Sequence, residues 1–107
     1  MKKGDIVLIP FPCTDLSGIN NTPALILFIS DIDVIVAFIT SWTKINENFD
    51  IKLDPSDING LKRISYIKLN KLATLVIDLI IGNLGKLNES ELKTVDNKLI
   101  ELLKLQN

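Results

Sequence analysis

Histidine is missing from this 107-residue sequence, which contains only one cysteine, Cys13, and one arginine. Without histidine the chain lacks the commonest general base and metal ligand at neutral pH. A lone cysteine excludes an internal disulfide and a cysteine-rich metal cluster. Because no imidazole is present to activate its thiol, we interpret Cys13 as a plain loop or core residue. We therefore expect no metal and no cofactor, and any chemistry should be metal-independent.

Long uninterrupted hydrophobic runs are also missing. The longest apolar region, 24–42, is interrupted by Asp31 and Asp33, which leaves two runs too short to span a bilayer. The first apolar stretch is broken by Asp5 and by two prolines, so it lacks the hydrophobic region of a secretory signal. The sequence therefore predicts a cytoplasmic protein without a membrane span. No linker or repeat divides residues 1–107, which predicts a single domain.

Charge of one sign is not in excess, since the formal net charge is only −1. This excludes a global basic field of the kind that drives strong non-specific nucleic-acid binding, so an RNA site must be a local patch. The best patch is 62–71, which has four positive charges and no acid: Lys62, Arg63, Lys68 and Lys71. Tyr66 and Lys68 would share one face of a strand and could combine base stacking with a phosphate contact. Alternatively, these are solvated edge charges around a half-buried tyrosine.

The composition is that of a folded domain, because 47% of residues are hydrophobic and 23% are charged. Short β-type runs dominate the first three quarters of the chain. The runs at 24–30 and 34–42 predict a hairpin buried on both faces, the central pair of the sheet. Pro10, the polar stretch 14–23 and Asn70 separate the runs. The predicted strands are 5–9, 24–30, 34–42, 49–53, 65–69, 71–76 and 79–86. Many short, closely spaced strands indicate a small barrel.

The last segment changes to the period of an amphipathic helix. Asn88 and Glu91 have the spacing of a capping box, and Leu87 can pack on Leu92, which predicts a helix starting at Asn88. The apolar stripe comprises Leu92, Val95, Leu99, Leu102 and Leu103. Such a stripe would cover the end of the barrel, or part of it would serve a dimer.

Several runs, in order and spacing, resemble the MazF/PemK-type toxins of type II toxin–antitoxin systems. They are 4–12, 14–18, 23–27, 34–41, 60–69, 71–75 and 81–87, and together they cover most of the chain. The resemblance implies a mainly β fold, a small half-open SH3-like barrel with a C-terminal α-helix. It further implies a homodimer that acts on single-stranded RNA as a metal-independent endoribonuclease and is neutralised by an antitoxin protein.

The resemblance also identifies a missing charge. In the family an Arg-Pro pair ends the loop after the first strand, and that arginine cleaves RNA together with a threonine at the end of the central strand. Here the pair is Thr22-Pro23, whereas the threonine is retained as Thr40. A guanidinium offers rigid paired donors and a permanent charge, but a threonine hydroxyl offers one neutral donor. We therefore expect impaired cleavage.

The remaining candidates have two readings each. Asp15 is a general base or a turn-forming residue, and Trp42 is a core or interface aromatic, or a stacking platform beside Thr40. The predicted RNA contacts are Asp15, Ser17, Gly18, Ser41, Trp42, Lys62, Arg63, Tyr66 and Lys68. Two functions stay open: an endoribonuclease toxin, active or weakened, and a catalytically silent relative that binds an antitoxin-like peptide or RNA. A general peptide-binding SH3 module has little support, because only 6% of residues are aromatic.

Overall fold

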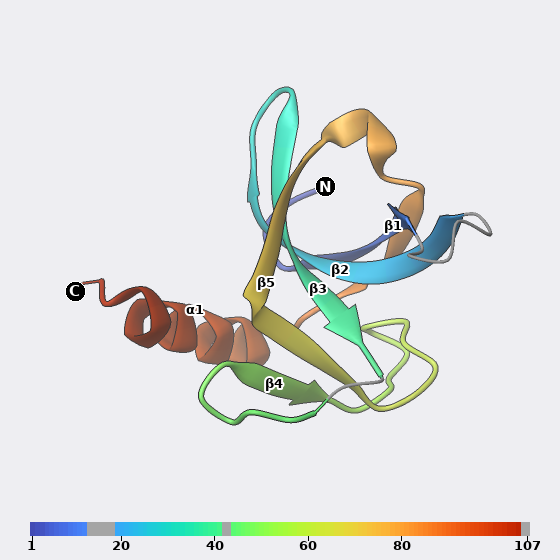
Figure 1. Ribbon diagram of the computed structural model, residues 1–107. Coiled ribbons are helices and arrows are strands. Elements are labelled where there is room, and N and C mark those ends of the chain that lie inside the picture. The colour runs from blue at the N-terminus through green and yellow to red at the C-terminus, as the bar shows by residue number, and fades with distance from the viewer. Residues whose placement is uncertain (13–18, 42–43, 106–107) are drawn as a thin grey trace.

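The computed structural model describes residues 1–12, 19–41 and 44–105 of the chain (Figure 1). Its elements are, in order, β1 (Asp5–Pro12), β2 (Ile19–Ile29), β3 (Asp33–Thr40), β4 (Asp50–Leu53), β5 (Ser65–Val76), the 3-10 helix η1 (Ile77–Leu79), β6 (Gly82–Lys86) and α1 (Glu89–Leu103). The strands form one six-stranded antiparallel sheet in the order β4-β5-β3-β2-β1-β6. The predicted mainly β fold with a C-terminal helix is confirmed.

The hairpin of β2 and β3 occupies the centre of this sheet and is buried on both faces, as predicted. Successive residues of a strand point to opposite faces, so each strand contributes to two clusters. The helix-side core consists of Ile6, Leu25, Ala37, Ile39, Leu53, Leu61, Ile67, Leu69, Leu87 and Val95. The far-side core consists of Val7, Ile9, Ala24, Ile26, Val34 and Val36, partly covered by Leu75, Ile77 and Ile80.

Strand β5 corrects the prediction of two strands separated at Asn70. The adjacent residues Ala37 and Phe38 of β3 pair with Leu72 and Lys68 of β5, so residues 69–71 form a bulge. Asn70 does not start a turn because both halves of β5 continue along the same neighbour, and a bulge bends a strand without ending it. Figure 1 shows this bend near the middle of β5.

Further strand boundaries differ from the prediction. Strand β2 begins at Ile19 rather than at residue 24, because residues 19–23 of the predicted polar loop pair with residues 8–12 of β1. Strand β1 continues through Pro10 to Pro12, because it pairs with β2 along this stretch whereas β6 pairs with β1 only as far as Leu8. Proline has no backbone N–H group to donate, so it is tolerated where its nitrogen faces a side of the strand that has no neighbouring strand. The predicted strand 79–86 begins later, at Gly82, because η1 precedes it.

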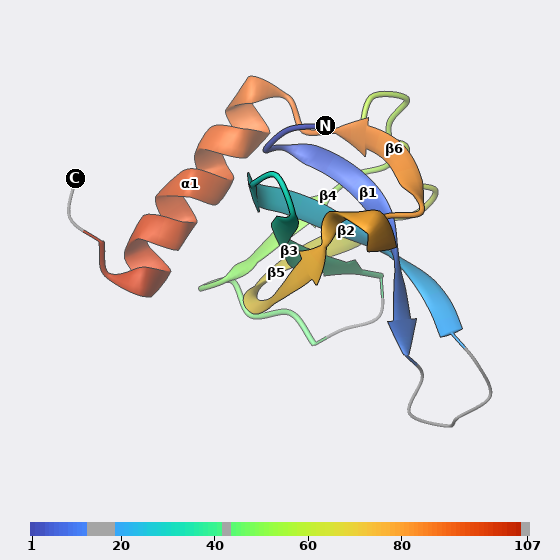
Figure 2. The same ribbon diagram turned by 90° about the horizontal axis from the view of Figure 1, so that it is seen from above.

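The sheet curls into a half-open barrel whose edges are linked by the segment between β4 and β5. In that segment Ile58 accepts a hydrogen bond from the backbone amide of Lys86 in β6, at 3.0 Å. Figure 2 shows this segment beside β6 on the side of the molecule away from α1. The segment and β6 approach each other so closely that a Cβ atom on Gly85 would lie 2.2 Å from the carbonyl oxygen of Ile58.

Helix α1 starts where predicted. The Asn88 side chain accepts from the backbone amide of Glu91 at 2.7 Å, and the Glu91 carboxylate accepts from the amide of Asn88 at 2.9 Å. Four stripe residues pack in or against the helix-side core: Leu92, Val95, Leu99 and Leu102. The prediction for Leu103 is wrong: this residue is 54% exposed, because it follows Leu102 directly and so lies about 100° around the helix from it. No helix in the described ranges is long and apolar enough to cross a membrane.

Candidate functional site

Thr22 lies on β2 where the central hairpin opens. It pairs with Ile9 of β1, and Ala24 is the first β2 residue paired with β3. The Thr22 hydroxyl donates to the carbonyl oxygen of Ile39, at 3.4 Å, and so spans the gap between the two strands. The half-buried side chain thereby lies next to the backbone that leads into Thr40.

Thr40 is the last residue of β3 and is half-buried. It pairs with Tyr66 of β5, which in turn pairs with Lys52 of β4. Directly paired residues share a face of the sheet, so these three side chains form one row. The preceding residue, Ile39, points into the helix-side core, which places the row on the opposite face.

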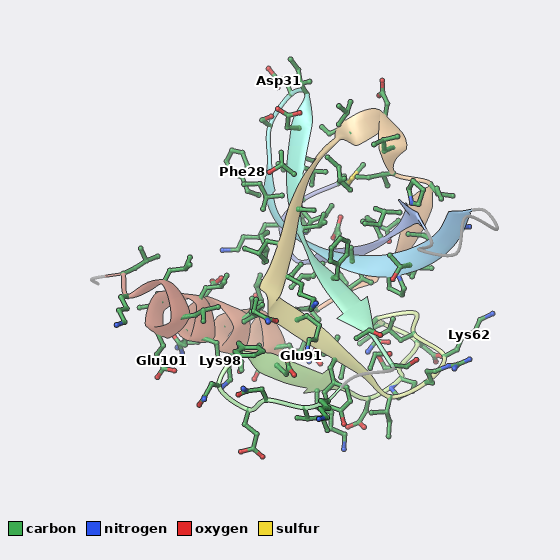
Figure 3. All side chains as sticks on the ribbon, viewed as in Figure 1. Phe28, Asp31, Lys62, Glu91, Lys98 and Glu101 are labelled. Carbon is green, nitrogen blue, oxygen red and sulfur yellow. The ribbon has the colours of Figure 1, made fainter. Side chains whose placement is uncertain are left out.

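A pocket of about 470 Å³ opens at the end of β3, and we name it the β3-end pocket. Its lining contains Leu8, Pro23, Ile39, Leu61 and Leu84 as apolar residues, with Asn21, Ser41, Gly60, Lys62, Arg63 and Ser65. The structure thus brings together three predicted contacts, Ser41, Lys62 and Arg63. Thr22 and Thr40 do not line the pocket: each lies between two residues that do, so their side chains point to the other face of the sheet. Figure 3 shows Lys62 at the end of the molecule away from Glu101 of α1.

A rigid turn presents the two cations of the pocket. Asn59 is 2% exposed. Its side-chain oxygen accepts hydrogen bonds from the backbone amides of Ser56 (3.0 Å) and Leu61 (2.9 Å). Its side-chain nitrogen donates a hydrogen bond to the carbonyl oxygen of Asp54 (2.8 Å). These bonds fix the backbone that leads to Lys62. Gly60 completes the turn with φ +71°, a conformation that favours glycine.

Beyond this turn, the hydroxyl of Ser65 donates a hydrogen bond to the carbonyl oxygen of Arg63 at 2.9 Å. The side chains of Lys62 and Arg63 stay exposed above it. Sequence reasoning missed Asn59 and Ser65. The turn-forming run 55–60 contains the signal for Asn59, because a serine and an asparagine three residues apart can cap each other's backbone amides.

Lys68 occupies a different environment from the one expected. It shares a face with Tyr66, as the parity argument predicted, because both are paired with residues of β3 two positions apart. Its side chain, however, is buried and forms an ion pair with Asp50, 2.8 Å away. Lys68 is therefore neither a solvated edge charge nor exposed to an RNA strand in this structure. The position of Lys68 along the strand predicts which face of the sheet its side chain is on, but not which segment covers that face.

Five residues discussed from the sequence lie outside the described residues: Cys13, Asp15, Ser17, Gly18 and Trp42. Tyr66 is half-buried beside Thr40 and is not part of the pocket lining. The described candidates therefore divide into the row that contains Thr40 and Tyr66, the bridging Thr22, and the pocket with its two exposed cations.

The fold is shared with solved toxin structures. A structure described as an endoribonuclease in complex with its cognate antitoxin, from a mycobacterial species, is similar with a TM-score of 0.78 and 18% identity, covering 100% of this chain and 98% of that chain. The Mycobacterium tuberculosis toxin MazF-mt6 is similar with a TM-score of 0.77 and 19% identity, covering 96% of this chain and 99% of that chain. These likenesses define the class of fold, the curled half-barrel with a C-terminal helix.

The amino-acid sequence matches a known protein family over most of its length. A comparison with curated protein sequences found no match. A family profile described as "PemK-like, MazF-like toxin of type II toxin-antitoxin system" matches residues 2–103. The chain therefore belongs to the PemK-like, MazF-like toxin family, and the resemblance seen in the sequence is confirmed.

Proposed function

We propose that this protein binds single-stranded RNA at the end of β3 and cleaves it feebly or not at all. The proposal rests on one observation: at the position where the resemblance expects an arginine, Thr22 offers a neutral hydroxyl that already donates to the carbonyl oxygen of Ile39. RNA as the ligand is supported by family membership, and by a solved structure of the same fold that is described as an endoribonuclease.

The chemistry explains why this residue matters. When the 2′-hydroxyl of RNA attacks the neighbouring phosphate, negative charge develops on the phosphate oxygens and protons must be removed and delivered. A guanidinium stabilises that charge through paired, permanently charged donors. Thr22 has one hydroxyl proton, and that proton is used within the protein. Loss of one preorganised donor typically costs about a hundredfold to a thousandfold in rate, and the sequence has no histidine to take over proton transfer.

The β3-end pocket supports binding independently of cleavage. Lys62 and Arg63 are exposed on its rim, where they can contact phosphate oxygens, and the guanidinium can do so with two parallel hydrogen bonds. Apolar side chains and the hydroxyl of Ser41 lie beside them. This arrangement suits a ligand that combines a phosphate with a flat, partly apolar base.

An antitoxin protein is the second proposed partner. The solved structure described as an endoribonuclease contains its cognate antitoxin, which supports a similar complex for this chain. A catalytically silent relative that binds an antitoxin-like peptide or RNA without cutting is the alternative function, and Thr22 favours it equally. We also propose a symmetric homodimer with the site near the subunit boundary, as the family resemblance implies.

Restoring the charge tests the proposal. The purified protein and its variants are incubated with a mixed RNA substrate in the presence of a chelator, and cleavage rates are compared. Thr22→Arg should raise the rate at least about a hundredfold, because it restores one charged donor. Thr22→Gln, which adds length without charge, should not. Combining Thr22→Arg with Thr40→Ala should abolish the gain.

Other outcomes have definite meanings. Robust metal-free cleavage by the unaltered protein would refute impairment, and its loss in Arg63→Ala would identify Arg63 on the pocket rim as a relocated catalytic cation. A folded Thr22→Arg variant without activity would support the binding-only alternative. Thermal unfolding of each variant shows whether the fold is retained, so that a change in the cleavage rate reports chemistry rather than unfolding.

A further inference from the structure

The ion pair of Lys68 and Asp50 is buried. Lys68 Nζ lies 2.8 Å from Asp50 Oδ2, and the two side chains are 7% and 0% exposed. By contrast, the pair of Lys3 and Asp96, also at 2.8 Å, joins side chains that are 46% and 41% exposed. Removing two charges from water is costly, and apolar replacements of similar size are often neutral or stabilising.

The second carboxylate oxygen of Asp50 adds to this cost. Oδ1 is buried, and no donor in the described part of the chain hydrogen-bonds to it. A buried acceptor without a donor is unfavourable. Stability alone is therefore a poor explanation for a charged pair at this position, and the directional contacts of the pair become the relevant feature.

Those contacts converge on the backbone of residues 44–50. Asp50 Oδ2 accepts from the amide of Asn46 at 2.8 Å, while Lys68 Nζ donates to the carbonyl oxygen of Lys44 at 3.5 Å and lies 5.6 Å from the ring centroid of Phe49. The carbonyl oxygen of Asn46 in turn accepts from the amides of Phe49 (3.1 Å) and Asp50 (2.8 Å). The pair thus fastens both ends of this segment to β5.

The segment follows closely after the candidate site in the chain. On the sheet, Lys68 pairs with Phe38 of β3 and with Asp50 of β4. The neighbouring row on the same face contains Thr40 and Tyr66. The ion pair is therefore one row away from Thr40, and it anchors the chain on the far side of Ser41.

We propose that Lys68 and Asp50 are positioning residues. Their buried pair selects one geometry for residues 44–50 and thereby holds the end of β3, with Thr40 and Ser41, in the arrangement that receives RNA. The hydrogen bonds that Lys68 donates to Lys44 and that Asp50 accepts from Asn46 impose a direction that apolar packing does not. The link to RNA rests on the proposed function, whereas the ordering of the segment does not.

An apolar replacement separates positioning from stability. Lys68→Met alone leaves the Asp50 carboxylate buried and unpaired, and should lower the melting temperature by more than about 10 °C. Lys68→Met with Asp50→Leu removes both charges and should restore the melting temperature. In that double variant, the amides of Phe49 and Asp50 should exchange hydrogen at least about tenfold faster, and binding of a single-stranded RNA oligonucleotide should weaken about tenfold. Lys3→Met, which removes an exposed pair, serves as the control and should change none of these.

Two results would overturn the proposal. If exchange at Phe49 and Asp50 in the stable double variant equals that of the unaltered protein, the pair does not order the segment. If exchange rises but RNA binds as before, the ordered segment does not position the site. Failure of the unaltered protein to bind RNA would refute the proposed function instead, and the exchange measurement would still decide whether the pair orders residues 44–50.

Discussion

Gly82 and Gly85 lie three residues apart on β6 but have different surroundings. A Cβ atom added to Gly85 would lie 2.2 Å from the carbonyl oxygen of Ile58 and 2.5 Å from the carbonyl carbon of Asn59, both backbone atoms. A Cβ atom on Gly82 would meet nothing within 4 Å. Gly85 therefore permits the close approach of the segment that carries the cations of the β3-end pocket.

Replacement of these two glycines by alanine should have unequal effects on stability. Gly85→Ala should lower the free energy of unfolding by about 1–3 kcal/mol, because backbone must shift to admit the methyl group. Gly82→Ala should change it by no more than about 0.5 kcal/mol. Urea unfolding of both variants measures the difference. Equal effects would show that residues 54–61 do not rest against β6.

Single residues differ in how well the sequence predicts them. Thr22 was assigned from sequence because the adjoining Pro23 and Ala24 fix its place in the family pattern. The burial of Lys68 was not predicted, because its partner Asp50 is 18 residues away and nothing local to either residue signals an ion pair. The pocket contribution of Ser65 likewise depends on strands meeting in space.

Helices and strands with strong local signals are the elements that the sequence predicts best. The start of α1 was predicted correctly because Asn88 and Glu91 satisfy each other's backbone amides within one helical turn. Strand β5 was misread because Asn70 has turn propensity, whereas its conformation is determined by pairing with β3 on both sides of the bulge. Tertiary pairing overrides weak local preference in strands.

Loss of the helix cap at Asn88 should destabilise the protein. Asn88→Ala should lower the free energy of unfolding by about 1 kcal/mol, because the amide of Glu91 loses its acceptor. Asn97→Ala, at an exposed position inside the same helix, is the matched control and should be neutral or slightly stabilising, since alanine is the better helix former. Thermal unfolding followed by circular dichroism compares the two. If Asn97→Ala proved the more damaging change, the cap would not be the stabilising feature.

For the whole molecule, the family pattern predicted the half-open barrel, but not what links its edges. The hydrogen bond between Ile58 and Lys86 joins residues from the two edge regions of the sheet. Such a contact has no local signature, because it depends on how far the entire sheet curls. The location of the β3-end pocket follows from the same curl and was equally inaccessible to sequence reasoning.

The exposed apolar surface of the chain bears on its assembly. Several large apolar side chains are 41–67% exposed, among them Phe28, Ile32, Leu72, Val76, Leu79 and Ile81. Exposed apolar surface of this kind often marks an interface, and the family resemblance implies a homodimer. Light scattering at micromolar concentration should therefore give twice the chain mass of 11.9 kDa. A monomer mass under these conditions would contradict the prediction.

The projecting part of the β1–β2 ribbon has a consequence for solubility. Figure 2 shows this ribbon extending away from the sheet, and none of the described strands pairs with the outer edge of β1 beyond Leu8. The carbonyl oxygen of Leu8 accepts a hydrogen bond from the amide of Ile81 at this outer edge. Backbone polar groups of residues two apart in a strand point to the same edge, so the nitrogen of Pro10 also faces the outer edge. A free strand edge is a template for aggregation, and proline removes the donor that an incoming chain would need. The outer edge of β1 can thus protrude into solvent without recruiting strands from other molecules into a fibril.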